Sequence, residues 1–271
     1  MKLKLNNKEY EGRFIHEDKY SLDCLASELA YNLELSQANG FRPVFMNELI
    51  DLRNKSKERK NLMNRVFITP SIKATGRTKQ GKGVIIYAHT NNYLSNPENL
   101  RKIKSHEEGS AVVPIKEFHK LLDLDGITDE NQNKLVWVMD YSTTRKKILQ
   151  FYSKYKSKIS NVNNVLNEHP EAIPFLCGEE RAREYLKTLE EFGINFMKVF
   201  TGSEGEEIDK EKNYFPLRYE FFEENSVWRF LGIYEYSPFG EDLVEFLNSY
   251  QHIHSNITEF LAIRKKPNKE K

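Results

Sequence analysis

The sequence predicts an α+β fold, in which mixed and irregularly connected sheets are flanked by helices. Three observations support this class. The 271 residues are 39% hydrophobic and 12% aromatic, which is enough to bury a sizeable core. Short runs rich in valine and isoleucine alternate with segments of helical periodicity. This alternation is irregular along the chain, which favours α+β over a regular doubly wound sheet.

Apolar runs and turn residues predict the strands. Asn6 and Asn7 separate two short alternating runs, a pattern typical of a tight hairpin. The later runs are bounded by glycine, proline, asparagine or charged residues, and the run Leu135–Tyr141 is apolar enough for a buried strand. The predicted strands are Lys2–Leu5, Lys8–Phe14, Val66–Ile72, Gly83–Thr90, Leu135–Tyr141, Asn195–Thr201, Leu217–Glu223, Val227–Tyr236 and Thr258–Arg264.

Apolar residues spaced three and four apart predict the helices. Gly40 and Gly193 stand where two of them end, as glycine commonly does. The predicted helices are Asp18–Gln37, Asn47–Asn64, Pro97–Lys104, Ile115–Leu122, Ser142–Ile159, Glu179–Phe192 and Glu241–Tyr250.

The stretch Ser160–Asn167 reads SNVNNVLN and is followed closely by Pro170 and Pro174, which is typical of a linker. We therefore expect two small domains, a basic one over residues 1–160 and an acidic one over 168–271. The first residues are polar at alternate positions and no apolar stretch approaches the roughly 20 residues of a membrane helix. We expect a cytoplasmic protein with no membrane partner.

Charge is unevenly distributed, although 41 basic residues nearly balance 40 acidic ones. Residues 53–82 hold ten lysines and arginines against one acid, and residues 141–167 hold six and no acid. Residues 179–245 hold 17 acids against eight bases. Lysine and arginine that neutralise phosphates supply most sequence-independent affinity for nucleic acid. The basic segments 53–82 and 141–158 therefore predict a binding protein for a phosphate-rich ligand, with nucleic acid as the favoured partner.

Two segments supply the candidate phosphate contacts. The stretch Lys73–Gly83 (KATGRTKQGKG) combines glycines with cations, as an anion-binding loop would, or is simply a mobile hairpin tip. The predicted helix start after Asp140 offers free backbone N–H groups and hydroxyls, or is an ordinary capped helix. The predicted contacts are Lys73, Arg77, Lys79, Lys82, Ser142, Thr143, Arg145, Lys146 and Lys147.

Three other interpretations stay open. An enzyme acting on a nucleotide or other phosphorylated small molecule could use Asp140 and His89 as an acid–base pair, if their strands run side by side in the same direction, or as a metal site. The basic and acidic parts could instead dock on one another, within the chain or between copies in a homo-oligomer. The 145–158 segment could also be an amphipathic helix with a core face through Ile148, Phe151, Tyr152 and Tyr155. The sequence does not identify a cofactor, and we predict no metal site at His252 and His254, because they lack a third ligand nearby.

Overall fold

The computed structural model of the chain describes residues 1–15, 25–63, 65, 67–105, 111–154, 162–192, 224–235, 244–245 and 260–265. Over these residues the chain forms helices and two sheets, and the strand pairs are antiparallel. The predicted α+β class is confirmed.

The smaller sheet has four strands in the order β1-β2-β11-β3. Its tight first turn has positive φ at both Asn6 (48°) and Asn7 (61°), a conformation that asparagine tolerates better than most residues. The strand β11 comes from the end of the described chain and pairs with β2 on one side and β3 on the other. The strands are β1 (Lys2–Leu5), β2 (Lys8–Ile15), β3 (Arg42–Pro43) and β11 (Phe260–Lys265).

The larger sheet has seven strands, six of them in the order β6-β7-β9-β4-β5-β8, with β10 paired to β9. The strand β9 therefore lies between β7 and β4, which precede it by more than a hundred residues. The strands are β4 (Phe67–Arg77), β5 (Gly83–Ala88), β6 (Lys104–Ser105), β7 (Ala111–Pro114), β8 (Val136–Asp140), β9 (Asn225–Glu235) and β10 (Val244–Glu245).

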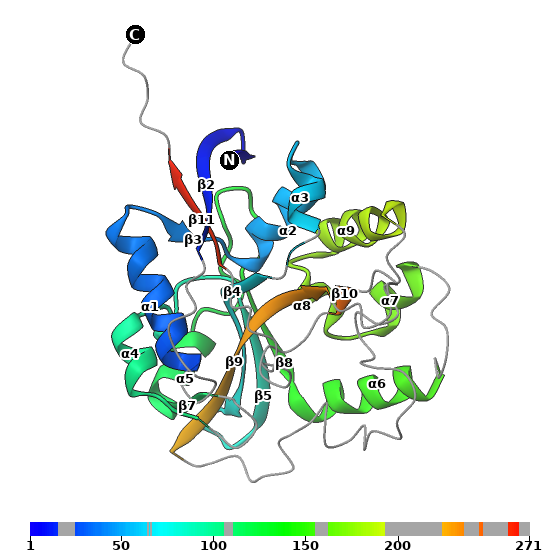
Figure 1. Cartoon of the computed structure of the whole chain (residues 1–271). Coiled ribbons are helices and arrows are strands. Elements are labelled where there is room, and N and C mark those ends of the chain that lie inside the picture. The colour runs from blue at the N-terminus through cyan, green and yellow to red at the C-terminus, as the bar shows by residue number, and fades with distance from the viewer. Residues whose placement is uncertain are drawn as a thin grey trace.

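Helices cover both faces of the larger sheet (Figure 1). Alternate residues of β5 belong to different core clusters: Ile85 and Tyr87 pack with α2 and α6–α9, whereas Val84 and Ile86 pack with α1, α4 and α5. Because both faces of β5 are buried, its residues are apolar throughout and do not alternate between apolar and polar. The helices are α1 (Leu25–Ala38), α2 (Met46–Lys55), α3 (Arg59–Met63), α4 (Pro97–Lys102), α5 (Ile115–Leu122), α6 (Tyr141–Lys154), α7 (Val162–Glu168), α8 (Ala172–Phe175) and α9 (Glu179–Glu191).

Both sheets combine strands from before and after the expected boundary near residues 160–168. The late strands β9 and β11 pair with β4, β7, β2 and β3. The expected division into domains 1–160 and 168–271 therefore does not correspond to the sheets.

Several local predictions differ from the structure. The predicted linker 160–167 contains most of α7, which packs Val165 and Leu166 into the core. The predicted helix Asn47–Asn64 is divided at Ser56 into α2 and α3. Within the predicted helix Glu241–Tyr250, Val244 and Glu245 instead form β10. The predicted strands Asn195–Thr201 and Leu217–Glu223 lie outside the described residues, as do His252 and His254.

Candidate functional site

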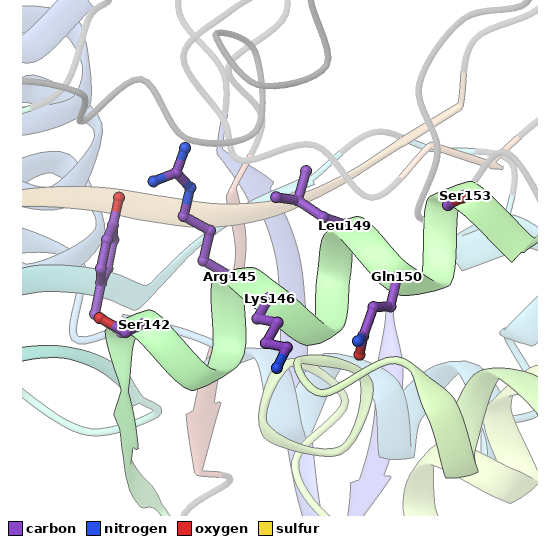
Figure 2. Close-up of a pocket in the computed structure, with 7 residues that line it drawn as sticks. Ser142, Arg145, Lys146, Leu149, Gln150 and Ser153 are labelled. Carbon is purple, nitrogen blue, oxygen red and sulfur yellow. The ribbon is translucent and has the colours of Figure 1, made fainter.

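The helix α6 carries the candidate site, a groove of about 470 Å³ along its exposed side. Because an α-helix has 3.6 residues per turn, side chains four apart form rows along its surface. One row of the groove consists of Tyr141, Arg145, Leu149 and Ser153, and the adjacent row consists of Ser142, Lys146 and Gln150. Figure 2 shows Arg145 and Leu149 projecting together from one side of α6, and Lys146 and Gln150 from the other.

The opposite side of α6 fixes the helix to the protein. Thr144, Ile148 and Phe151 are each buried, and the last two belong to the core cluster that includes α2 and α9. The helix is therefore amphipathic, with the predicted core face confirmed at Ile148 and Phe151. The side chain of Tyr152 and the whole of Tyr155 lie outside the described part of the chain. Sequence reasoning did not identify Tyr141, Leu149, Gln150 and Ser153 as groove residues, although the four-residue spacing from Arg145 and Lys146 could have indicated them.

The first turn of α6 is capped by the protein itself. Asp140, the last residue of β8, accepts a hydrogen bond from the backbone N–H of Thr143 at 2.7 Å, and its other oxygen lies 3.0 Å from Lys82 Nζ. Hydrogen bonds from the Thr143 side chain and backbone, followed by Lys82, lower the pKa of Asp140 to about 2. The Asp140 carboxylate thus takes the backbone N–H group of Thr143, which a phosphate at the helix start was expected to bind.

His89 and Asp140 do not share a crevice. Their strands β5 and β8 are neighbours but antiparallel, with Val84 opposite Asp140 and Ala88 opposite Val136. His89 directly follows β5 and therefore lies at the opposite end of the strand pair, about 17 Å from Asp140 at the usual rise per residue. The condition for an acid–base pair, strands running in the same direction, is not met.

His89 is a buried residue that ties β5 to α8. Its Nε2–H donates to the carbonyl oxygen of Pro174 at 2.8 Å, and its ring packs edge-on against Trp137. Burial lowers the pKa of His89 to about 4, so the ring is neutral at physiological pH. It lies in the core and not in the α6 groove.

The glycine-rich stretch forms a strand and a tight turn instead of an anion-binding loop. Its first part, Lys73–Arg77, belongs to β4. In the turn, the backbone N–H of Gly81 donates to Thr78, and the backbone N–H of Lys82 donates to the Thr78 hydroxyl. These donors are thus used within the turn, at whose tip Lys79 is exposed.

The predicted phosphate contacts are dispersed. Lys73 Nζ is largely buried and lies 2.6 Å from Glu171 Oε1. Ser142, Arg145 and Lys146 line the groove, whereas the neighbouring residues Thr143 and Lys147 are exposed outside it.

Three cations at the start of the basic segment 53–82 contact the acidic helix α9. Lys55 lies 3.4 Å from Glu184, and Arg59 lies 3.7 Å from Glu191. The fully buried Arg53 donates to the Tyr185 hydroxyl at 2.8 Å. Much of the basic charge thus faces the chain's own acidic part, an arrangement that segment totals do not reveal.

Two further features concern the described residues only. None of the helices there is long and apolar enough to cross a membrane. In the same residues, His, Cys, Asp and Glu side chains form no group of three or more that could hold a metal ion.

One of three comparisons with known proteins finds a match, and that match is a solved structure with a C-type lectin fold. A scan against protein-family models finds no match, and neither does a search of curated proteins. A solved structure described as "Accommodation of massive sequence variation in Nanoarchaeota by the C-type lectin fold" is similar, with a TM-score of 0.61 and 28% sequence identity. The match covers 96% of this chain and 100% of that one.

The comparison corrects the predicted function. The expectation of a protein that binds nucleic acid or another phosphate-rich ligand is wrong, because the similar structure is a C-type lectin fold whose description names no nucleic acid. The geometry supplies the physical reason: Lys55, Arg59 and Lys73 face carboxylates of the same chain, and Asp140 caps α6.

Proposed function

We propose that the chain is a recognition protein, whose C-type-lectin-like scaffold holds its shape while exposed side chains vary to suit a protein ligand. The observation that carries this proposal is the likeness over 96% of the chain to a C-type lectin fold that is described as accommodating massive sequence variation. A cytoplasmic location and self-association stay predictions from the sequence.

The separation of α6 into buried anchoring residues and exposed groove residues supports the proposal. Residues that hold the helix in place, such as Ile148 and Phe151, are 2% exposed, whereas the groove residues Ser142, Lys146 and Gln150 are exposed. Surface substitutions away from special contacts usually change stability by less than about 0.5 kcal/mol. Replacing the groove side chains therefore alters the surface chemistry while the core contacts of α6 remain.

A library at the exposed groove positions tests this proposal. Ser142, Lys146, Gln150 and Ser153 are randomised together, and a matched control library randomises the buried positions Thr144, Ile148 and Phe151. We expect most groove clones to unfold within a few degrees of the parent in thermal denaturation, and most control clones to be unfolded. Displayed groove clones are then selected against one purified folded protein that the parent does not bind.

Two results would contradict the proposal. One is a groove library that loses its fold as often as the control library. The other is a folded groove library from which no clone binds the chosen target above the parental background after repeated selection.

A further inference from the structure

We propose that the groove along α6 binds an acidic peptide segment of a partner protein that carries one large apolar side chain. The proposal rests on the recognition function above and adds the chemistry of the ligand. It follows from three properties of the groove, namely its length, its charge and its central apolar residue.

The length of the groove fits a short extended segment. Tyr141 and Ser153, at its two ends, are twelve residues apart, which is about 18 Å along an α-helix. An extended chain advances about 3.3 Å per residue, so five or six residues span this distance. The volume of about 470 Å³ falls within the range of about 300–1,000 Å³ that is usual for ligand pockets.

The charge of α6 favours a ligand with carboxylates. The helix contains Arg145, Lys146, Lys147 and Lys154 and no acidic residue. Lys154 lies 2.7 Å from Glu168 at the far end of the helix, whereas Lys146 is an exposed residue that lines the groove. The ammonium group of a lysine forms charge-assisted hydrogen bonds with carboxylates, so Lys146 favours an acidic ligand.

The centre of the groove requires an apolar contact. Leu149 is 38% exposed, and it is one of the three large apolar residues that are exposed in the described part of the chain. It lies between the cation Arg145 and the hydroxyl of Ser153 in its row. A phosphate backbone offers nothing to cover this side chain, whereas a peptide can place leucine or phenylalanine on it and acids on either side.

Fluorescence anisotropy with the full chain tests the proposal. The probe is a labelled decapeptide in which two aspartates or glutamates stand on each side of a central leucine. We expect saturable binding that Lys146→Glu weakens at least tenfold, and that Leu149→Ser or a leucine-to-serine change in the peptide weakens several-fold. The matched control is Lys147→Glu, with the same charge change one residue further along, outside the groove, and we expect less than a threefold effect.

Each contrary outcome has a clear meaning. Equal effects of Lys146→Glu and Lys147→Glu would show general attraction of charge, as would equal binding of inorganic polyphosphate, and either result overturns the proposal. No saturation by the parent peptide also overturns it. If the parent chain does not bind the peptide but the groove library still yields binders, only the proposal of an acidic peptide ligand is wrong, and the proposed recognition function stands. If the parent chain binds the peptide but the groove library does not fold, the proposal of a scaffold that tolerates variation is wrong instead.

Discussion

Lys73 and Glu171 form an ion pair in which both side chains are nearly buried, at 11% and 12% exposure. The pair joins β4 to the residue that precedes α8, and the ammonium of Lys73 also lies 5.6 Å from the centre of the Tyr87 ring. Burial raises the pKa of Tyr87 well above its usual value, and the neighbouring Glu171 adds to this effect. Either charge alone would be uncompensated by an opposite charge in a poorly solvated site, so removing one partner of the pair is costly.

Glu171→Gln should therefore lower the free energy of unfolding by about 3 kcal/mol. The matched control is Glu179→Gln, which removes the exposed partner of Arg183 and should cost less than about 1 kcal/mol. Urea denaturation of both variants measures the difference. The double change Lys73→Met with Glu171→Leu should recover much of the loss, and equal losses for Glu171→Gln and Glu179→Gln would refute the role of the buried pair.

Two buried histidines make stability depend on pH. Burial lowers the pKa of both His89 and His169 to about 4, below the value of about 6.5 that an unfolded chain would have. The unfolded state thus binds more protons between these values, so stability is lost as pH falls below about 6.5. Each histidine should remove about 2 kcal/mol between pH 7.5 and 5.

Unfolding by urea at a series of pH values from 7.5 to 5 measures this loss. In His89→Gln the loss of stability should fall to about half, because one of these two buried histidines is removed and His169 remains. A His89→Gln variant with the same pH profile as the parent would contradict the assignment.

At the scale of the element, Gly76 was predicted to lie in a loop but is part of the strand β4. A Cβ atom added there would lie 3.0 Å from the Cβ of Ser226 in β9 and 3.1 Å from the ring of Phe118 in α5. The glycine thus allows β4, β9 and α5 to approach closely. Its role is in packing.

Gly76→Ala should destabilise the protein by about 1–2 kcal/mol through overpacking. Adding Phe118→Leu should recover part of the loss, because the smaller side chain makes room for the new methyl group. Thermal unfolding of the single and double variants measures both effects. An alanine variant as stable as the parent would show that the neighbours adjust freely.

Local chemistry explains which elements the sequence predicts correctly. The helix Ile115–Leu122 has the predicted bounds, and the hairpin at Asn6 and Asn7 forms as expected, because periodicity and turn preference decide both locally. By contrast, Lys73–Arg77 is part of a strand because it pairs with β5 and β9. Likewise, Val244 is part of a strand because it pairs with β9. Such pairing depends on distant residues.

The same limit applies to the site. Charge totals identify α6 correctly as a helix rich in cations, and Ser142, Arg145 and Lys146 do line its groove. They cannot show that Glu171, Glu184 and Glu191 lie against the cations of residues 55–73, because these contacts span more than 90 positions. The predicted pairing of His89 with Asp140 failed for a related reason, since strand direction is a property of the whole sheet.

At the scale of the whole molecule, β9 and β11 complete both sheets. We expect residues 1–160 expressed alone to be unfolded, because β4 and β7 would lack β9 between them and β2 would lack β11. Amide dispersion in a two-dimensional NMR spectrum and cooperativity in urea measure this, with the full chain as control. A truncated chain with dispersed signals and a cooperative transition would instead support an independent domain 1–160.

The central place of β9 also sets the timing of folding during synthesis. A ribosome adds about 5–20 residues per second, so roughly ten seconds separate residue 114 at the end of β7 from residue 235 at the end of β9. Throughout this interval one edge of β4 has no strand to pair with, and unpaired edges are the places where nascent chains aggregate. The newly made protein is therefore most exposed to aggregation until β9 has been synthesised and has paired with β4.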